Sequence, residues 1–62
     1  MKLREIREEN GFTQNQVADF LNIKQNTYSQ YENEKRQLPI DVLIKLSKFY
    51  KVSTDYILGL ED

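Results

Sequence analysis

The stretch T-Q-N-Q-V-A-D-F-L-N-I-K-Q-N-T-Y-S-Q-Y-E-N, residues 13–33, decides the fold that the sequence predicts. Thr13 begins this stretch, and Gln16 stands three residues later, which is the capping-box arrangement at the start of a helix. Asn22 ends that helix, because asparagine is one of the few residues besides glycine that tolerate a positive φ. A second helix follows almost at once, at about residues 25–33. The stretch therefore predicts two short helices joined by a sharp turn.

Two helices that cross at about 90–120° through such a turn form a helix-turn-helix, which lays its second helix in the major groove of DNA. Close crossing requires a small residue where the backbones meet, and Ala18 is the fifth residue of the unit that begins at Gln14. The turn requires a residue that accepts the left-handed conformation, and Asn22 is the ninth. Apolar side chains must anchor both helices to a core, and this stretch supplies Val17, Leu21, Ile23, Tyr28 and Tyr31. We interpret residues 13–33 as a helix-turn-helix.

Three further helices complete the domain that the sequence predicts. Residues 2–9 have the pattern of an amphipathic helix that stops before Gly11. Pro39 suits the first turn of a fourth helix, whose apolar stripe has a period of about 3.6 residues: Leu43, Leu46, Phe49 and Tyr50. Ser53 is a good N-cap for a fifth helix, and Gly59 ends it. Since no segment alternates apolar and polar residues, we expect an all-α, five-helix fold.

The composition narrows the range of functions. Sixty-two residues make one domain, residues 1–62. The chain has no cysteine and no histidine, so we expect no metal, no cofactor and no enzymatic activity. The N-terminus has no apolar signal core, and the apolar runs are far shorter than the roughly 20 residues that span a bilayer. We expect a cytoplasmic protein with no membrane contact and no small-molecule ligand.

The formal net charge is −1, which argues mildly against a nucleic-acid partner. The charges are unevenly distributed, however. Acidic residues gather in the first helix and in the terminal Glu61-Asp62 pair, whereas Lys35 and Arg36 follow the second helix of the motif. A local basic surface on an acidic molecule is consistent with this pattern.

The second helix of the motif has a polar face opposite Tyr28 and Tyr31, formed by Gln25, Asn26 and Gln30. Asparagine and glutamine pair bidentately with adenine in the major groove. The alternative is a merely solvated face, which is the usual reading for an arbitrary helix. A second alternative uses Tyr28 and Tyr31 as stacking platforms for single-stranded bases, but their spacing places both on the core side. Within this motif we favour reading of duplex DNA.

Residues 3–60 resemble the lambdoid phage repressor and Cro family of helix-turn-helix domains, also called the Xre type. The resemblance rests on L-R-E-I-R-E-E-N-G-F-T-Q-N-Q-V-A-D-F-L-N-I and on Y-S-Q-Y-E-N-E-K-R-Q. The segment L-I-K-L-S-K-F-Y-K-V-S-T-D-Y-I-L-G is similar to the fourth and fifth helices of single-domain bacterial members. The resemblance implies a lambda-repressor-like fold, sequence-specific DNA binding and transcriptional regulation, with repression as the expected outcome.

The resemblance also implies roles for individual residues. Base-reading positions correspond to Gln25, Asn26, Gln30 and Thr27. Positions that contact the DNA backbone correspond to Gln14, Ser29, Lys35 and Arg36, and Lys24 adds a cation close to DNA. Gln14 is also expected to brace the recognition helix. Arg7 and Glu32 correspond to a structural ion pair that joins the first and third helices.

Four positions depart from the family pattern. Glu34 replaces the usual glycine, which implies a strain of roughly 1 kcal/mol if the backbone is left-handed there. Lys24 replaces a Ser or Thr cap worth about 1 kcal/mol. Leu38 replaces a common proline, although a proline follows it. Phe20 stands where polar residues are frequent, and it either contacts a partner or packs against the loop that contains Phe12.

The expected partner is double-stranded DNA with a pseudo-palindromic operator, bound by a homodimer that forms in solution or only on DNA. We expect the dimer contacts in the fifth helix and the tail, at Tyr56, Leu58 and Leu60. The alternative function is a protein-interaction module, in which the motif serves as an antitoxin, an adaptor or a subunit of a larger regulator. Binding to mixed DNA at low salt distinguishes the two.

Overall fold

The computed structural model describes residues 1–61, so that Asp62, the last residue of the acidic pair, lies outside the described residues. These residues form five helices and no strand: α1 (Leu3–Glu9), α2 (Gln14–Leu21), α3 (Gln25–Glu32), α4 (Ile40–Tyr50) and α5 (Thr54–Leu58). The prediction of an all-α, five-helix fold is confirmed. None of the helices in residues 1–61 has the length and apolar character that crossing a bilayer requires.

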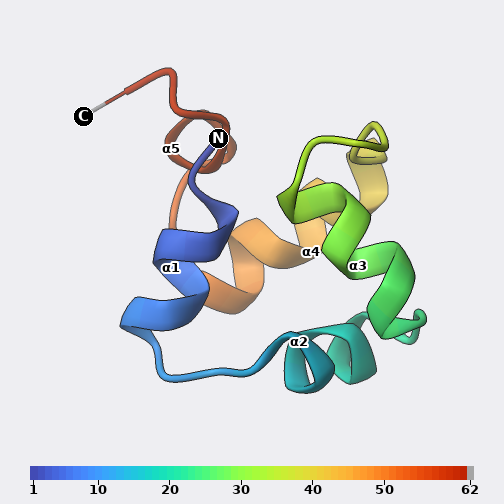
Figure 1. The fold of residues 1–62 in the computed structure, drawn as a ribbon. Helices are drawn as coiled ribbons and strands as arrows, with labels where there is room; N and C mark the ends of the chain where they lie inside the picture. The colour runs from blue at the N-terminus through green and yellow to red at the C-terminus, as the bar shows by residue number, and fades with distance from the viewer. Residues whose placement is uncertain (62) are drawn as a thin grey trace.

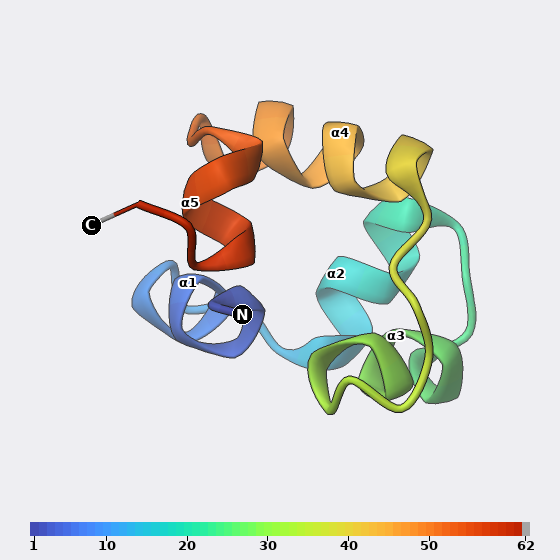
Figure 2. The same ribbon diagram turned by 90° about the horizontal axis from the view of Figure 1, so that it is seen from above.

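The core takes side chains from every helix: Leu3, Ile6, Val17, Ala18, Leu21, Tyr28, Tyr31, Val42, Leu46, Tyr50 and Ile57. The N-terminal segment lies beside α5 (Figures 1 and 2), where the N–H of Lys2 donates to the carbonyl of Ile57 at 2.8 Å. Seen from above, α3 lies at the edge of the molecule opposite α4 (Figure 2). One side of α3 therefore packs on the core while the other faces solvent.

The turn between α2 and α3 forms as the sequence predicts. The Thr13 side chain accepts from the N–H of Gln16, and the Gln16 side chain accepts from the N–H of Thr13, which completes the capping box. Asn22 has φ 59° and ends α2 in the left-handed conformation. Ala18 is 1% exposed, and α2 packs directly against α3. The helix-turn-helix of residues 13–33 is confirmed.

The start and the buried side of α4 differ in detail from the prediction. Pro39 precedes the helix as its N-cap residue with ψ 149°, so α4 begins one residue later than expected. Val42, which the predicted stripe omits, is buried, and it lies one helical turn before Leu46. Leu43 and Phe49 are only partly buried, because the centre of the apolar stripe runs along Val42, Leu46 and Tyr50.

Among residues 1–61, three non-glycine residues have a left-handed backbone: Asn22, Glu34 and Lys51. Lys51 ends α4 with φ 58°, a position at which glycine is usual. The sequence contains no signal for this turn, because lysine has no preference for positive φ. Gly59 ends α5 with φ 81°, as predicted.

Candidate nucleic-acid interface

Helix α3 has a buried side and an exposed side. Tyr28 and Tyr31 are 0% and 5% exposed and belong to the core. Three amide side chains are exposed on the rest of the helix, and we call them the amide face of α3: Gln25, Asn26 and Gln30. Because both tyrosine rings are buried, they are unavailable as stacking platforms for bases.

Thr27 and Ser29, the two hydroxyl residues of α3, are half-buried between the core and the amide face. The Ser29 hydroxyl accepts from Nδ2 of Asn33 at 3.3 Å, near the end of the helix. Both short side chains therefore retain some exposed surface beside the amide face.

Three exposed cations flank the amide face: Lys24 before α3, and Lys35 and Arg36 after it. The side chains of Thr13 and Ser53 accept hydrogen bonds from the first turns of α2 and α5. Lys24, the N-cap residue of α3, makes no such side-chain hydrogen bond. The first N–H groups of α3 therefore remain available to water or to an anionic ligand.

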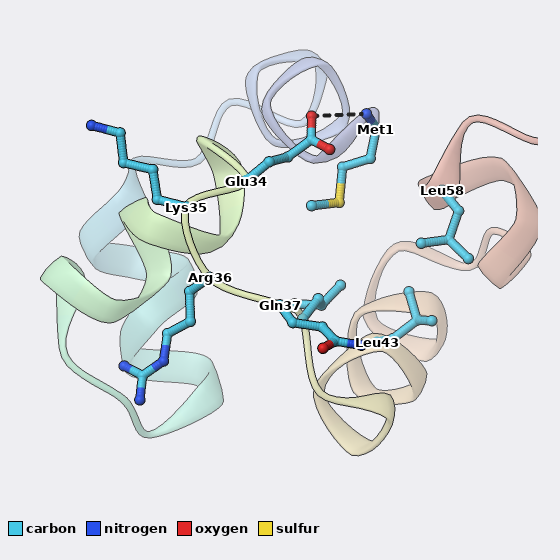
Figure 3. A pocket seen from close by; sticks show the side chains of 8 residues that line it. Met1, Glu34, Lys35, Arg36, Gln37, Leu43 and Leu58 are labelled. Atoms are coloured by element: carbon cyan, nitrogen blue, oxygen red, sulfur yellow. Dashed lines mark ion pairs between the residues drawn. The ribbon is translucent and has the colours of Figure 1, made fainter.

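The loop of residues 34–38 turns its charges in opposite directions (Figure 3). Glu34 has φ 56°, so the backbone there is left-handed and carries the strain that a Cβ imposes. Its carboxylate faces the Met1 ammonium at 3.5 Å, whereas Lys35 and Arg36 extend away from it. Because the Glu34 carboxylate points toward Met1, its negative charge lies on the other side of the loop from the two cations.

A hollow of about 560 Å³ lies between this loop, Met1, Leu43 and Leu58. Figure 3 shows the Met1 side chain directed into it, opposite Leu58. Of the expected dimer residues, Leu58 is 39% exposed and Leu60 is 72% exposed. Tyr56 is half-buried, and the Lys2 ammonium lies 4.9 Å from the centre of its ring.

The Glu32 carboxylate, at the end of α3, is the most densely bonded charge near the amide face. Its side chain has no exposed surface. Arg7 Nε lies 2.7 Å from Oε2 and Arg7 Nη2 lies 3.4 Å from Oε1. Gln14 Nε2 donates to Oε1 at 3.0 Å, and Arg4 Nε approaches the same oxygen at 3.5 Å. Side chains from α1 and α2 thus converge on one carboxylate of α3.

These contacts keep Glu32 ionised. Burial by itself raises the pKa of the Glu32 carboxyl, but the polar groups of Arg7, Tyr28 and Gln14, with Arg7 first among them, outweigh burial, and the pKa lies below its ordinary value. The Arg7 guanidinium has a raised pKa because of its hydrogen bond to Glu32.

Burial also raises the pKa of Tyr28 well above its ordinary value and that of Tyr50 to about 12. Neither tyrosine hydroxyl has a hydrogen bond of normal geometry within residues 1–61.

Gln14 connects this carboxylate to the amide face. While Nε2 of Gln14 donates to Glu32, its Oε1 accepts from Nε2 of Gln25 at 3.5 Å, a long hydrogen bond. Gln14 therefore lies between the ion pair and the first residue of α3, in a position that suits the bracing role implied by the resemblance.

Arg4 was absent from the predicted site. Its Nη2 donates to Oδ1 of Asn33 at 2.9 Å, next to its approach to Glu32. A sequence signal existed, because Arg4 and Arg7 are spaced i, i+3 and therefore share one face of α1.

Phe20 is 48% exposed and stacks on Phe49 of α4, with ring centroids 4.1 Å apart. The Phe12 ring also packs near Phe49, with ring centroids 5.3 Å apart. Of the two alternatives for Phe20, the stack supports packing within the domain: Phe20 joins the aromatic cluster that contains Phe12, with Phe49 of α4 as its direct neighbour. Within residues 1–61, no cluster of His, Cys, Asp or Glu side chains is suited to a metal.

A family model described as helix-turn-helix (HTH_3) matches residues 3–57. The chain belongs to the helix-turn-helix family. The match includes all of α1 to α4 and most of α5, so that the family likeness covers the whole core of this helix-turn-helix domain.

The relatives of this helix-turn-helix domain include proteins of bacteria and of their phages. It is 46% identical over 61 residues to the HTH-type transcriptional regulator ImmR of Bacillus subtilis, covering 98% of this chain and 48% of ImmR. It is 41% identical over 61 residues to the uncharacterized HTH-type regulator YobD of the same species, covering 98% of this chain and 54% of YobD. It is 35% identical over 51 residues to the cryptic phage CTXphi transcriptional repressor RstR of Vibrio cholerae, covering 82% of this chain and 46% of RstR.

The chain thus spans about half the length of the curated relatives that it matches. No solved structure gives a significant match.

Proposed function

We propose that this helix-turn-helix domain binds double-stranded DNA sequence-specifically and acts in a transcriptional regulator, as a repressor. One observation carries the proposal: the amide face of α3 is exposed and flanked by exposed cations, on a helix anchored by two buried tyrosines. Exposed amides provide base-specific hydrogen bonds, and flanking cations provide phosphate contacts. The regulator and repressor names of ImmR and RstR support the same assignment.

In this proposal α3 enters the major groove with the amide face toward the base edges. The base-reading residues are Gln25, Asn26, Gln30 and Thr27. The residues that contact the DNA backbone are Gln14, Ser29, Lys24, Lys35 and Arg36. Because Glu34 points toward Met1, its charge opposes the phosphates less than its place in the sequence implies.

The acidic net charge does not conflict with this assignment. Electrostatic attraction to phosphate depends on the charge nearest the DNA, since charges farther away than about 8 Å are largely screened at physiological salt. The exposed cations Lys24, Lys35 and Arg36 flank the amide face, whereas the Glu32 carboxylate is buried and paired with Arg7.

We further propose that two copies bind a pseudo-palindromic operator, with α5 and the tail between them. Leu58 and Leu60 are exposed apolar side chains that follow the half-buried Tyr56, and Leu58 also lines the hollow. A dimer places two recognition helices about 34–36 Å apart, one helical turn of DNA. Its site of action is the bacterial cytoplasm, in keeping with the bacterial and phage origin of its relatives.

Selection of bound sequences from a random duplex pool tests the function directly. The expected result is a short enriched sequence with two-fold symmetry and half-sites one helical turn apart. A salt series supplements the selection. With three cations on phosphates, log K should fall with log salt at a slope of about −3 per copy. No measurable affinity for any duplex at about 50 mM salt would rule out the proposal.

A further inference from the structure

Three side chains from two helices form a continuous hydrogen-bonded series: Glu32, Gln14 and Gln25. Glu32 Oε1 accepts from Gln14 Nε2 at 3.0 Å, and Gln14 Oε1 accepts from Gln25 Nε2 at 3.5 Å. The series begins at a carboxylate with no exposed surface and ends at an exposed member of the amide face. It connects a buried charge to a base-reading position.

The chemistry of the first group determines the orientation of the other two. An ionised carboxylate only accepts hydrogen bonds, so Gln14 must turn its NH₂ group toward Glu32. The carbonyl oxygen of Gln14 then faces Gln25, and an oxygen there repels a second oxygen. Gln25 must therefore turn its own NH₂ group toward Gln14. The negative charge of Glu32 thus selects one of two amide orientations at Gln14 and, through it, at Gln25.

This orientation has a consequence for base reading. One N–H of Gln25 is used toward Gln14, which leaves the second N–H and Oε1 for the base. Adenine is recognised by a side-chain oxygen that accepts from N6 and an N–H that donates to N7. The orientation that Glu32 selects therefore leaves Gln25 with both groups that adenine requires.

We propose that the buried carboxylate of Glu32 is a specificity-determining positioning group, which acts through Gln14 to orient the Gln25 amide toward the base it reads. The inference rests on the proposed function. It gives Glu32 a role beyond its ion pair with Arg7. The ion pair needs only a partner for the guanidinium, whereas the positioning role needs a group that cannot donate toward Gln14.

The test compares base discrimination at one position of the selected operator, the base pair whose preference is lost in Gln25→Ala. Discrimination is the ratio of Kd for the substituted site to Kd for the selected site. In Glu32→Gln, Arg7 holds the amide oxygen at the Oε2 position, so the NH₂ group faces Gln14 and the parent orientations of the Gln14 and Gln25 amides are no longer selected. The ratio should fall by about fivefold or more at that base pair and stay unchanged at the others.

A double variant tests the orientation rather than the charge at position 32. Gln14→Glu combined with Glu32→Gln places an acceptor-only group next to Gln25 again, and the amide at position 32 donates to it. The ratio should return to within about twofold of the parent value. Affinity for all sequences should fall at the same time, because a carboxylate at position 14 lies near the phosphates. Restored discrimination together with weaker binding is not expected of a structural defect.

Two further variants complete the design. Arg4→Met removes another side chain that approaches the same carboxylate, and it should leave the ratio unchanged. Gln14→Met preserves the Arg7–Glu32 pair, so it keeps the test informative if Glu32→Gln does not fold, and it should lower the ratio at the same base pair. Circular dichroism and thermal melting verify that each variant is folded at the assay temperature.

The outcomes separate the inference from the function on which it rests. If the parent domain selects no sequence, the proposed function fails. If the parent is selective but folded Glu32→Gln or Gln14→Met keeps the parent ratio, the positioning role is wrong while the function stands. Equal losses at every base pair, or a folded double variant without recovery, would also overturn it.

Discussion

Arg7 Nε on α1 lies 2.7 Å from Oε2 of Glu32 at the end of α3, and the Glu32 side chain has no exposed surface. The same guanidinium donates from Nη1 to the carbonyl of Phe12 at 2.8 Å. One side chain therefore joins α1, the loop before α2, and α3. This relationship ties the proposed recognition helix to the N-terminal helix through a buried charge.

Arg7→Met should destabilise the domain by about 3–5 kcal/mol, because it leaves the Glu32 carboxylate buried without its main partner. A domain of this size has a stability of only about 5 kcal/mol, so the variant should be largely unfolded at 37 °C. Urea denaturation followed by circular dichroism at 222 nm measures the loss. Arg36→Met is the matched control, since Arg36 is exposed, and it should change stability by no more than about 0.5 kcal/mol. A similar small loss for both variants would contradict the structural role of the pair.

Acid should remove the stabilisation that Glu32 contributes. Because its pKa in the folded state is lowered, this stabilisation is fully present above the unfolded-state pKa of about 4.3 and is lost as the pH falls through the folded-state value. The charged and titratable groups that face Glu32 are Arg7, Arg4, Tyr28 and Tyr50, and none of these four is a carboxyl.

The comparison with Glu32→Gln isolates this effect from the titration of other carboxylates. The difference in unfolding free energy between the parent and Glu32→Gln should be constant from pH 7 to about pH 5 and should shrink toward pH 2. Urea titrations at each pH measure it. A difference that grows as the pH falls would mean that the carboxyl is easier to protonate in the folded state.

Gln25→Ala and Arg36→Ala should weaken DNA binding in different ways. Loss of the Gln25 amide should cost the selected site about 1–3 kcal/mol and leave random DNA almost unaffected. Loss of the Arg36 cation should weaken all sequences similarly and reduce the salt slope by about 1. Fluorescence anisotropy with selected and scrambled duplexes at several salt concentrations measures both. Equal losses on both duplexes for Gln25→Ala would remove it from base reading, and a sequence-dependent loss would remove Arg36 from phosphate binding.

Glu34→Gly should be more stable than Glu34→Ala by about 1 kcal/mol. The backbone has φ 56° at this position, and glycine relieves the strain that any Cβ imposes there. Both variants lose the carboxylate that faces the Met1 ammonium, so their difference reports the backbone alone. Thermal melts of the two proteins measure it. Equal melting temperatures would show that the left-handed turn imposes no strain.

Lys24→Ser should stabilise the domain by about 0.5–1 kcal/mol by supplying a side-chain cap at the start of α3. The same change removes a proposed phosphate contact, so the salt slope of DNA binding should fall by about 1. Lys45→Ser is the control, because Lys45 is an exposed residue inside α4, where serine gives no cap and lowers helix propensity. Urea denaturation should thus move in opposite directions for the two variants. Destabilisation by Lys24→Ser would show that the existing start of α3 needs no cap.

The two faces of α3 were predictable from the sequence because a helical period places Tyr28 and Tyr31 on one side and the amides elsewhere. The Arg7–Glu32 contact followed from the resemblance to a family. The link from Gln14 to Glu32 was not predictable, because it joins residues 18 positions apart whose distance depends on how α2 crosses α3. The pairing of Met1 with Glu34 has the same origin, since it depends on where α1 lies relative to the loop after α3.

The sequence by itself determined the local features of this domain. The Thr13–Gln16 capping box, the left-handed Asn22 and the Gly59 stop each depend on atoms within a few residues, so their side-chain chemistry is sufficient. Only the tertiary structure decided that Phe20 stacks on Phe49, that Val42 is buried, and that Lys51 adopts a positive φ. Each of these features depends on how distant helices pack; at Lys51, burial of apolar surface by the packed helices stabilises the fold more than one unfavourable backbone conformation costs.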